Sequence, residues 1–428
     1  MVYYSARRIF LVQPAHSMSQ SSQIEFVHVL RGCAALLVAL EHLCIVFWYN
    51  KAAVTHLTNL PAVPDTVQPP LSTRLVFSFG YAPLGFTELW NLSSFAIALF
   101  YLISGFVVPF SLRKTAVPGF LAARAIRLWP TYAAGLTLAI LSVAVGSAVE
   151  NAPFPHGYRD ILSNYCLGMR DVLRAPSLDG IVHTLEIEIK FYLLLALCAS
   201  MVRERKVALF RFVAPALCAL VFAYPILAKV VSPRHAFFFQ VGPKLASDFR
   251  FVIFLLIGTA LHFHFDGSVD KREATKHVLV LFVLSSACSF RLDAYEIAVQ
   301  QTFCDGKALA LFACCYVFRE QFVGACSALT KLADVSYSLY VSHGIFSYTL
   351  MNLLVRRFHA SPDVSFAIAF VSCLFVASVL HRYVESPTQR LASKISSRWR
   401  LQPSGPPSAG CLTLPRRCKD VVKEVVCT

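Results

Sequence analysis

The segment RGCAALLVALEH, residues 31–42, joins an apolar run to an arginine at its start and a Glu-His pair at its end. Its composition predicts a helix within a membrane, where an ionisable side chain costs about 2.5–3.5 kcal/mol on insertion scales. Eleven positions separate Arg31 from His42. At about 100° per residue, both project from one helix face, roughly 16 Å apart along the axis. Such groups usually line a cavity or pair with one another. Taken singly, Arg31 is also compatible with a side chain that reaches the lipid headgroups, and His42 with a structural histidine.

The composition of the whole chain is typical of a membrane protein. Hydrophobic residues make up 57% of the 428 residues and charged residues 15%, against roughly 45–50% and 25% in globular proteins. Apolar runs of about 20 residues can cross a hydrocarbon core, and they predict an all-α polytopic protein with about ten transmembrane helices in one bundle. The seventh run is short and interrupted by small residues, so nine or eleven spans are also compatible. The ten runs are 27–48, 93–112, 129–149, 183–202, 210–231, 249–265, 277–290, 302–318, 332–355 and 366–384.

The net charge of +15 follows the expected membrane topology. With the N-terminus inside, most Lys and Arg residues fall on the cytoplasmic side, which is the positive-inside pattern. We therefore expect a multi-pass protein of the inner (plasma) membrane with both termini in the cytoplasm. The charge is expected to contact membrane lipid, and no nucleic acid partner is expected. The 14 cysteines show no spacing typical of metal ligands, so no metal site is expected.

Three regions are expected along the chain. Residues 1–23 form a polar N-terminal segment, in which Met18 is an alternative start. The stretch SARRIFLV in this segment resembles an export signal, but its apolar run is about four residues long, against roughly 7–15 in a signal peptide. Residues 24–390 hold the membrane-embedded domain. Residues 391–428 are basic and are expected to form a disordered cytoplasmic tail.

Two motifs place polar residues beside the second and third apolar runs. LFYLISGF (99–106) holds Ser104 next to a glycine in a bulky run, which is also typical of ordinary small-residue packing between helices. RAIRLWPTY (124–132) places Arg124 and Arg127 about one turn apart near a helix start. Two guanidinium groups in this position can bind a phosphate, although positively charged residues at a cytoplasmic helix end would look the same.

A third motif, HTLEIEIKFY (183–192), opens the fourth apolar run with two glutamates. Glu186 and Lys190 are four positions apart and are expected to pair. Glu188 lies on the helix face of Tyr192, which is also four positions away. A carboxylate and a phenol are therefore expected side by side near one end of this span.

These motifs, in this order, resemble the signatures of acyltransferase family 3, bacterial membrane O-acyltransferases that modify cell-envelope glycans. RGCAALLVALEH is similar to the family's first-span signature, an arginine, ten residues and a histidine. LFYLISGF, RAIRLWPTY and HTLEIEIKFY resemble the family's next motifs, and SYSLYVSHG (336–344) and YVESP (383–387) its closing ones. The resemblance covers about residues 24–390. His183 and Thr184 stand where the family has Trp-Ser, a departure that concerns the acceptor pocket.

The resemblance implies transfer of an acyl group, most often acetyl, from cytoplasmic acyl-CoA to a hydroxyl outside. The acceptor would be a glycan, such as O-antigen or exopolysaccharide, or a lipid-linked saccharide. Acyl-CoA is then a co-substrate, and no permanently bound cofactor is implied. Within this frame Arg31, Arg124 and Arg127 are expected to bind the donor, because its phosphates require fixed positive charge.

The same resemblance, with the chemistry of the side chains, assigns four catalytic residues. His42 is expected to be the general base, because an imidazole with a pKa near 6.5 suits proton removal from a hydroxyl. A transient acyl group on His42 is the alternative. Glu188 is expected to orient His42 or the acceptor, and Tyr192 and Ser104 to donate hydrogen bonds to the developing oxyanion.

Other functions are also compatible with the sequence. A multi-pass transporter or permease would bury charge too, but it predicts internal symmetry with paired broken helices, which the sequence does not show. An acyltransferase of the same family that acts on a small secondary metabolite or a lipid would share all of these motifs. So would one that transfers a larger group, such as a succinyl or fatty acyl chain.

Overall fold

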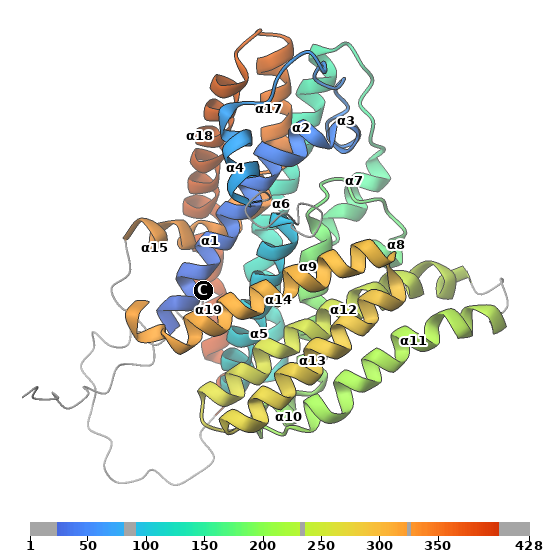
Figure 1. Cartoon of the computed structure of the whole chain (residues 1–428), viewed down its shortest axis with the longest axis vertical. Coiled ribbons are helices and arrows are strands. Elements are labelled where there is room, and N and C mark those ends of the chain that lie inside the picture. The colour runs from blue at the N-terminus through green and yellow to red at the C-terminus, as the bar shows by residue number, and fades with distance from the viewer. Residues whose placement is uncertain (1–23, 81–90, 232–235, 323–326, 402–428) are drawn as a thin grey trace, which may run out of the picture.

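The computed structural model describes residues 24–80, 91–231, 236–322 and 327–401. These residues are almost entirely helical and contain no β-strand, only one isolated bridge between Thr115 and Arg400. The prediction of an all-α polytopic membrane protein is confirmed at this level. In Figure 1, α11 to α14 lie together on one side of the molecule and α17 and α18 on the other, with α1, α5 and α6 between them.

Seven helical stretches are long and apolar enough to cross a membrane. They coincide with seven of the ten predicted runs, and each consists of one helix or of helices that continue one another. The stretches are Glu25–Tyr49 (α1 Glu25–Glu41, η2 His42–Val46, α2 Phe47–Tyr49), α5 Leu92–Lys114, α6 Val117–Val149, Leu209–Val230 (η4 Leu209–Val213, α11 Ala214–Val230), Val241–Phe265 within α12 Ala236–Phe265, α13 Lys271–Leu292, and Pro362–Arg398 (α18 Pro362–Leu380, η6 His381–Glu385, α19 Ser386–Arg398).

The other three predicted runs are helical but do not reach this standard, so the count of ten spans is not confirmed. The fourth run is divided at Cys198 into α9 and α10, and the eighth carries Asp305 and Lys307 within its helix α14. The ninth, expected as one helix, is broken at Val335 and Gly344 into α15, α16 and α17. The bounds are α9 Val182–Leu197, α10 Ala199–Arg203, α14 Tyr295–Val317, α15 Ser327–Asp334, α16 Ser336–Ser342 and α17 Ile345–Arg356.

Short helices fill the connections between the longer ones. They are α3 Lys51–Thr58, α4 Leu71–Gly80, α7 Tyr158–Tyr165, α8 Arg170–Leu173 and η5 Arg319–Phe322. At the C-terminal end, α19 continues past residue 390 to Arg398. The rest of the predicted tail and the predicted N-terminal segment, with Met18, lie outside the described residues.

Helices α5 and α12 cross in close contact. A Cβ atom added at Gly105 would overlap the carbonyl oxygen of Leu255, and one added at Gly258 would overlap that of Leu102. The Thr259 hydroxyl donates to the Gly105 carbonyl oxygen across this crossing, at 3.1 Å. Small residues that let two helix backbones touch are a usual feature of helix packing in membranes. This contact fixes the position of Ser104, the residue next to Gly105.

Candidate active site

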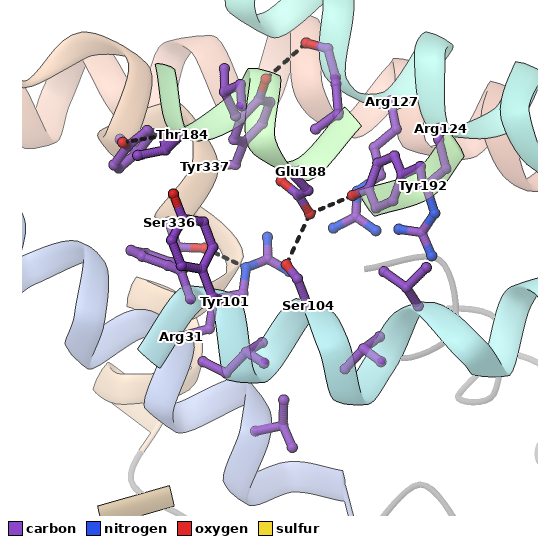
Figure 2. Close-up of a pocket in the computed structure, with 18 of the residues that line it drawn as sticks. Arg31, Tyr101, Ser104, Arg124, Arg127, Thr184, Glu188, Tyr192, Ser336 and Tyr337 are labelled. Atoms are coloured by element: carbon purple, nitrogen blue, oxygen red, sulfur yellow. Dashed lines mark hydrogen bonds between the residues drawn. The ribbon is translucent and has the colours of Figure 1, made fainter. Parts of the chain in front are cut away.

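A cavity lies where α1, α5, α6, α9 and α16 meet (Figure 2). Its empty space measures about 1050 Å³, including the part open to solvent. Six of the seven site residues predicted from the sequence line it: Arg31, Ser104, Arg124, Arg127, Glu188 and Tyr192.

The rest of the cavity wall is mostly apolar, with a rim of hydroxyl groups. The hydroxyl groups come from Tyr101 on α5, from Thr184 on α9 and from Ser336, Tyr337 and Tyr340 on α16. A largely apolar wall with a few convergent polar groups is typical of ligand sites. The apolar lining residues are Ile24, Val27, Ile97, Phe100, Ile103, Val107, Val108, Leu128 and Leu185.

Three guanidinium groups make the cavity strongly positive. The Arg31 Nε atom donates to the Ser336 hydroxyl at 2.9 Å. Arg124 donates to the Ser111 hydroxyl at 2.7 Å, and its guanidinium lies over the Tyr192 ring, 5.2 Å from the centroid. Arg127 makes no hydrogen bond or ion pair with any residue that the structure describes, and it lies near the other two arginines. A wall with three such groups suits a ligand that brings several negative charges.

Glu188 is the carboxylate that faces these arginines. The Ser104 hydroxyl donates to its Oε1 atom at 2.9 Å, and the Tyr192 hydroxyl donates to the same oxygen (Figure 2). The hydroxyl groups that were expected to face an oxyanion are therefore bound to Glu188 in this structure. Glu188 was expected to orient either His42 or the acceptor. No contact joins Glu188 to His42 among the described residues, so only the role toward the acceptor remains as a prediction.

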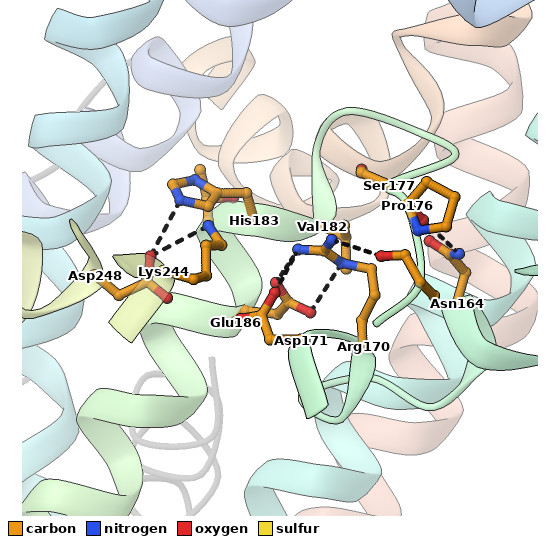
Figure 3. A network of polar contacts seen from close by, with 12 residues as sticks. Asn164, Arg170, Asp171, Pro176, Ser177, Val182, His183, Glu186, Lys244 and Asp248 are labelled. Atoms are coloured by element: carbon orange, nitrogen blue, oxygen red, sulfur yellow. Dashed lines mark hydrogen bonds and ion pairs between the residues drawn. The ribbon is translucent and has the colours of Figure 1, made fainter. Parts of the chain in front are cut away.

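The opposite side of α9 holds a buried network of charges (Figure 3). The predicted pairing of Glu186 with Lys190 is wrong, because both residues have other partners. Glu186 binds Arg170 through two hydrogen bonds of 2.6 and 3.1 Å. Lys190 binds Asp171 at 3.0 Å and Asp248 at 2.5 Å. These partners come from α8 and α12, so sequence spacing within α9 could not identify them.

His183 and Thr184, the two residues that depart from the family motif, lie on different sides of α9. His183 contacts Asp248 at 3.2 Å, while Thr184 faces the cavity and lies 2.6 Å from the Tyr340 hydroxyl. Asp248 is completely buried. Charged partners on one side of α9 thus hold the helix so that Thr184 and Glu188 point into the cavity on the other side.

His42 lies at a second polar centre, separate from the cavity. It does not line the cavity, although α1 is regular between Arg31 and Glu41, so the two predicted residues do share a helix face. Its Nδ1 atom lies 2.5 Å from the Tyr348 hydroxyl, and its ring meets the ring of His343 edge-on, with centroids 4.7 Å apart. A π-helical turn begins at His42, and such turns often occur at functional sites.

Helix α16 connects the two centres. Its first residue, Ser336, contacts Arg31, and His343 directly after its last residue contacts His42. His343 belongs to the SYSLYVSHG motif, so a signal for it is present in the sequence, although it was not selected as a site residue. Tyr348 belongs to no quoted motif, and only the tertiary structure brings it to His42. In the described residues, no group of three or more His, Cys, Asp or Glu side chains could hold a metal ion.

A comparison with protein-family models gives a match over most of the chain. Residues 24–382 match a family model described as an acyltransferase domain, that of acyltransferase family 3. No curated protein and no solved structure matches the chain. The matched region contains the whole cavity and the second polar centre, and it covers most of the 428 residues. The chain therefore belongs to acyltransferase family 3 and is a membrane acyltransferase by family.

Proposed function

We propose that this protein transfers an acyl group, in the simplest case acetyl, from acyl-CoA to a hydroxyl of an extracytoplasmic glycan or lipid-linked saccharide. The observation that carries the proposal is the arrangement along α1. Arg31 faces a cavity with two further arginines, and His42 follows on the same helix face. The roughly 16 Å between them along the axis is on the scale of the pantetheine arm of coenzyme A.

The charge of the cavity supports an acyl-CoA donor. Arg31, Arg124 and Arg127 line the cavity with one carboxylate, Glu188, and Glu385 lies near Arg31 and Arg127 without lining it. Three positive charges against these two negative ones leave an excess of positive charge for the donor's phosphates. Guanidinium groups bind phosphate oxygens through paired hydrogen bonds. The apolar wall of the cavity would accept the uncharged arm of the donor.

A second, smaller cavity supports entry of the donor from the cytoplasm. Arg124 and Arg127 line it together with Ser393 and Ser396 of α19. It lies beside the α5–α6 turn, where Arg203 donates to the Thr115 carbonyl oxygen at 2.9 Å. Basic residues of several segments gather there, and the positive-inside rule assigns such an end to the cytoplasm. We accordingly propose an inner (plasma) membrane location with both termini cytoplasmic.

The chemistry requires a base for the acceptor hydroxyl. In the proposed step, the hydroxyl oxygen attacks the thioester carbonyl while His42 removes the hydroxyl proton. The carbon–sulfur bond then breaks, and coenzyme A leaves as a thiol after taking up the proton. The products are an ester and free coenzyme A, and no other reactant is needed. A transient acyl-imidazole on His42 would divide the same transfer into two steps.

Isolated membranes that hold the full-length protein test the proposal directly. Radiolabelled acetyl-CoA is supplied, and base-labile acetyl esters of the membrane glycans are measured by mass spectrometry. Ester formation should depend on His42 and fall by about 10²–10⁴-fold in His42→Ala. A His42→Ala protein that inserts normally and acetylates at the full rate would disprove the role of His42. Unchanged esters combined with altered uptake of a solute would favour a transporter instead, and label in a lipid or small metabolite would change the acceptor class.

A further inference from the structure

Tyr348 is a buried tyrosine that none of the sequence motifs includes. It lies on α17 with 1% of its surface exposed, in an apolar cluster with Phe47 and Met351. Its hydroxyl lies 2.5 Å from the Nδ1 atom of His42. The two rings are nearly parallel, at 11° with centroids 5.9 Å apart. The Tyr348 hydroxyl is therefore in direct contact with the predicted general base, and its effect on His42 can be derived from the geometry.

Among the described residues, Tyr348 is the hydrogen-bond partner of His42 Nδ1, and His343 does not compete for this atom. The Nδ1 atom of His343 faces the carbonyl oxygens of Tyr340 and Leu339, at 2.7 and 3.3 Å. Both are acceptors, so this nitrogen carries the hydrogen. The Nε2 atom of His343 is buried and has no hydrogen-bond partner in the described part of the chain. His343 therefore packs against His42 without competing for its Nδ1 atom.

We propose that Tyr348 is a positioning residue for His42, an inference that rests on the proposed function. In the tautomer that can remove a proton with Nε2, the His42 Nδ1 atom carries hydrogen and donates it to the phenolic oxygen of Tyr348. This bond holds the ring orientation and the required tautomer. In the catalytic triads of hydrolases, a buried carboxylate does this work.

A phenol suits this place better than a carboxylate does. A charged side chain at membrane depth costs about 2.5–3.5 kcal/mol on insertion scales, and Tyr348 provides an acceptor without a charge. The apolar residues around it hold its ring, so the oxygen stays at one position. When His42 takes a proton from the acceptor hydroxyl, the same oxygen continues to accept the Nδ1 hydrogen of the imidazolium.

The test compares Tyr348→Phe with the wild type in membranes that hold the full chain, with acetyl-CoA as donor. We expect kcat to fall about 10- to 100-fold, as for loss of a hydrogen bond to a group that becomes charged, with KM for acetyl-CoA unchanged. The control is Tyr132→Phe, since Tyr132 is a fully buried tyrosine outside the cavity whose hydroxyl donates to the Asn164 carbonyl oxygen. It should keep the wild-type kcat.

A double variant separates positioning from simple stabilisation. If Tyr348 acts through His42, adding Tyr348→Phe to His42→Ala leaves the residual rate unchanged, because the group that it positions is already gone. A second loss of similar size in the double variant, or a wild-type kcat in Tyr348→Phe, would overturn the inference. Full activity of His42→Ala alone would instead overturn the proposed function, so the two failures are distinguishable.

A gentler change keeps the test valid if Tyr348→Phe does not accumulate in membranes. 3-Fluorotyrosine at position 348 keeps the ring and the hydroxyl but makes the oxygen a weaker acceptor. We expect kcat to fall about twofold or more, with KM for acetyl-CoA again unchanged. An unchanged kcat with this residue would argue against positioning by the phenolic oxygen.

Discussion

Arg31 and His42 project from the same face of α1 but bind to different polar centres, Arg31 to Ser336 and His42 to Tyr348. Between them on this face lie Ala35 and Val38, both buried. About three turns of helix thus separate the positively charged cavity from the half-buried imidazole of His42. Under the proposed function, the acyl end of the donor would have to span this distance to meet His42.

Arg127 is the cavity arginine that makes no hydrogen bond or ion pair with a described side chain, so its guanidinium can bind an anionic donor and its loss should weaken that binding. In Arg127→Gln, we expect KM for acetyl-CoA to rise about tenfold, as for loss of a hydrogen bond to a charged group, with a smaller change in kcat. Initial rates over a range of acetyl-CoA concentrations measure both. Arg398→Gln, at an exposed position of α19, is the control. An unchanged KM in Arg127→Gln would remove this residue from the donor site.

Glu188 holds two hydroxyl groups through one oxygen, so its charge should matter more than either hydroxyl. Glu188→Gln keeps the shape but removes the charge, and we expect transfer to fall about 100-fold, within the range for positioned acid–base groups. Ser104→Ala removes one of the two bonds and should cost about tenfold. The exposed Glu204→Gln is the control. A larger loss in Ser104→Ala than in Glu188→Gln would contradict this order.

The crossing of α5 and α12 should tolerate no side chain at Gly258. A methyl group there would overlap the backbone of α5, and neither helix can move without disturbing the core. We expect Gly258→Ala to lower the melting temperature in detergent and to reduce the amount of protein in the membrane. Gly306→Ala is the matched control, because the nearest atom to its added methyl group is in the Phe282 ring, at 3.5 Å. Equal melting temperatures for the two variants would show that the crossing can adjust.

Asp179, in the loop before α9, should make stability depend on pH. It is buried, and burial raises its pKa from 3.8 to about 6. Between about pH 4 and 6 the folded carboxyl group binds more protons than the unfolded one, so stability falls as pH rises through this window. The full effect is about 3 kcal/mol.

Asp179→Asn tests this dependence. An asparagine keeps the oxygen that accepts from the Ile181 and Val182 amides but cannot ionise. The melting temperature of the variant, relative to the wild type, should therefore increase from pH 4 to pH 7. A difference in melting temperature that stays constant from pH 4 to pH 7 would show that folding does not raise the pKa of Asp179.

The sequence by itself determined the fold class, the family and most of the cavity. Apolar runs of bilayer length identify membrane spans directly, because the hydrocarbon core favours apolar side chains along the whole length of a span. Arg31 and Glu188 are conspicuous because a charge within an apolar run is costly. Ser104, Arg124, Arg127 and Tyr192 were selected because their motifs resemble those of the family. Spacing within one helix also placed Arg31 and His42 on a common face.

Only the tertiary structure decided which partners these residues have. Lys190 binds Asp248, far away in the sequence, and not its neighbour Glu186, because a buried charge takes the partner that packing brings within reach. Likewise, Tyr348 reaches His42 across 306 positions. The break of the ninth predicted span into α15, α16 and α17 is another such result, since apolar composition is the same in a continuous helix and in one interrupted by a turn. Composition reports which residues are buried, whereas the contacts between helices decide what each buried residue does.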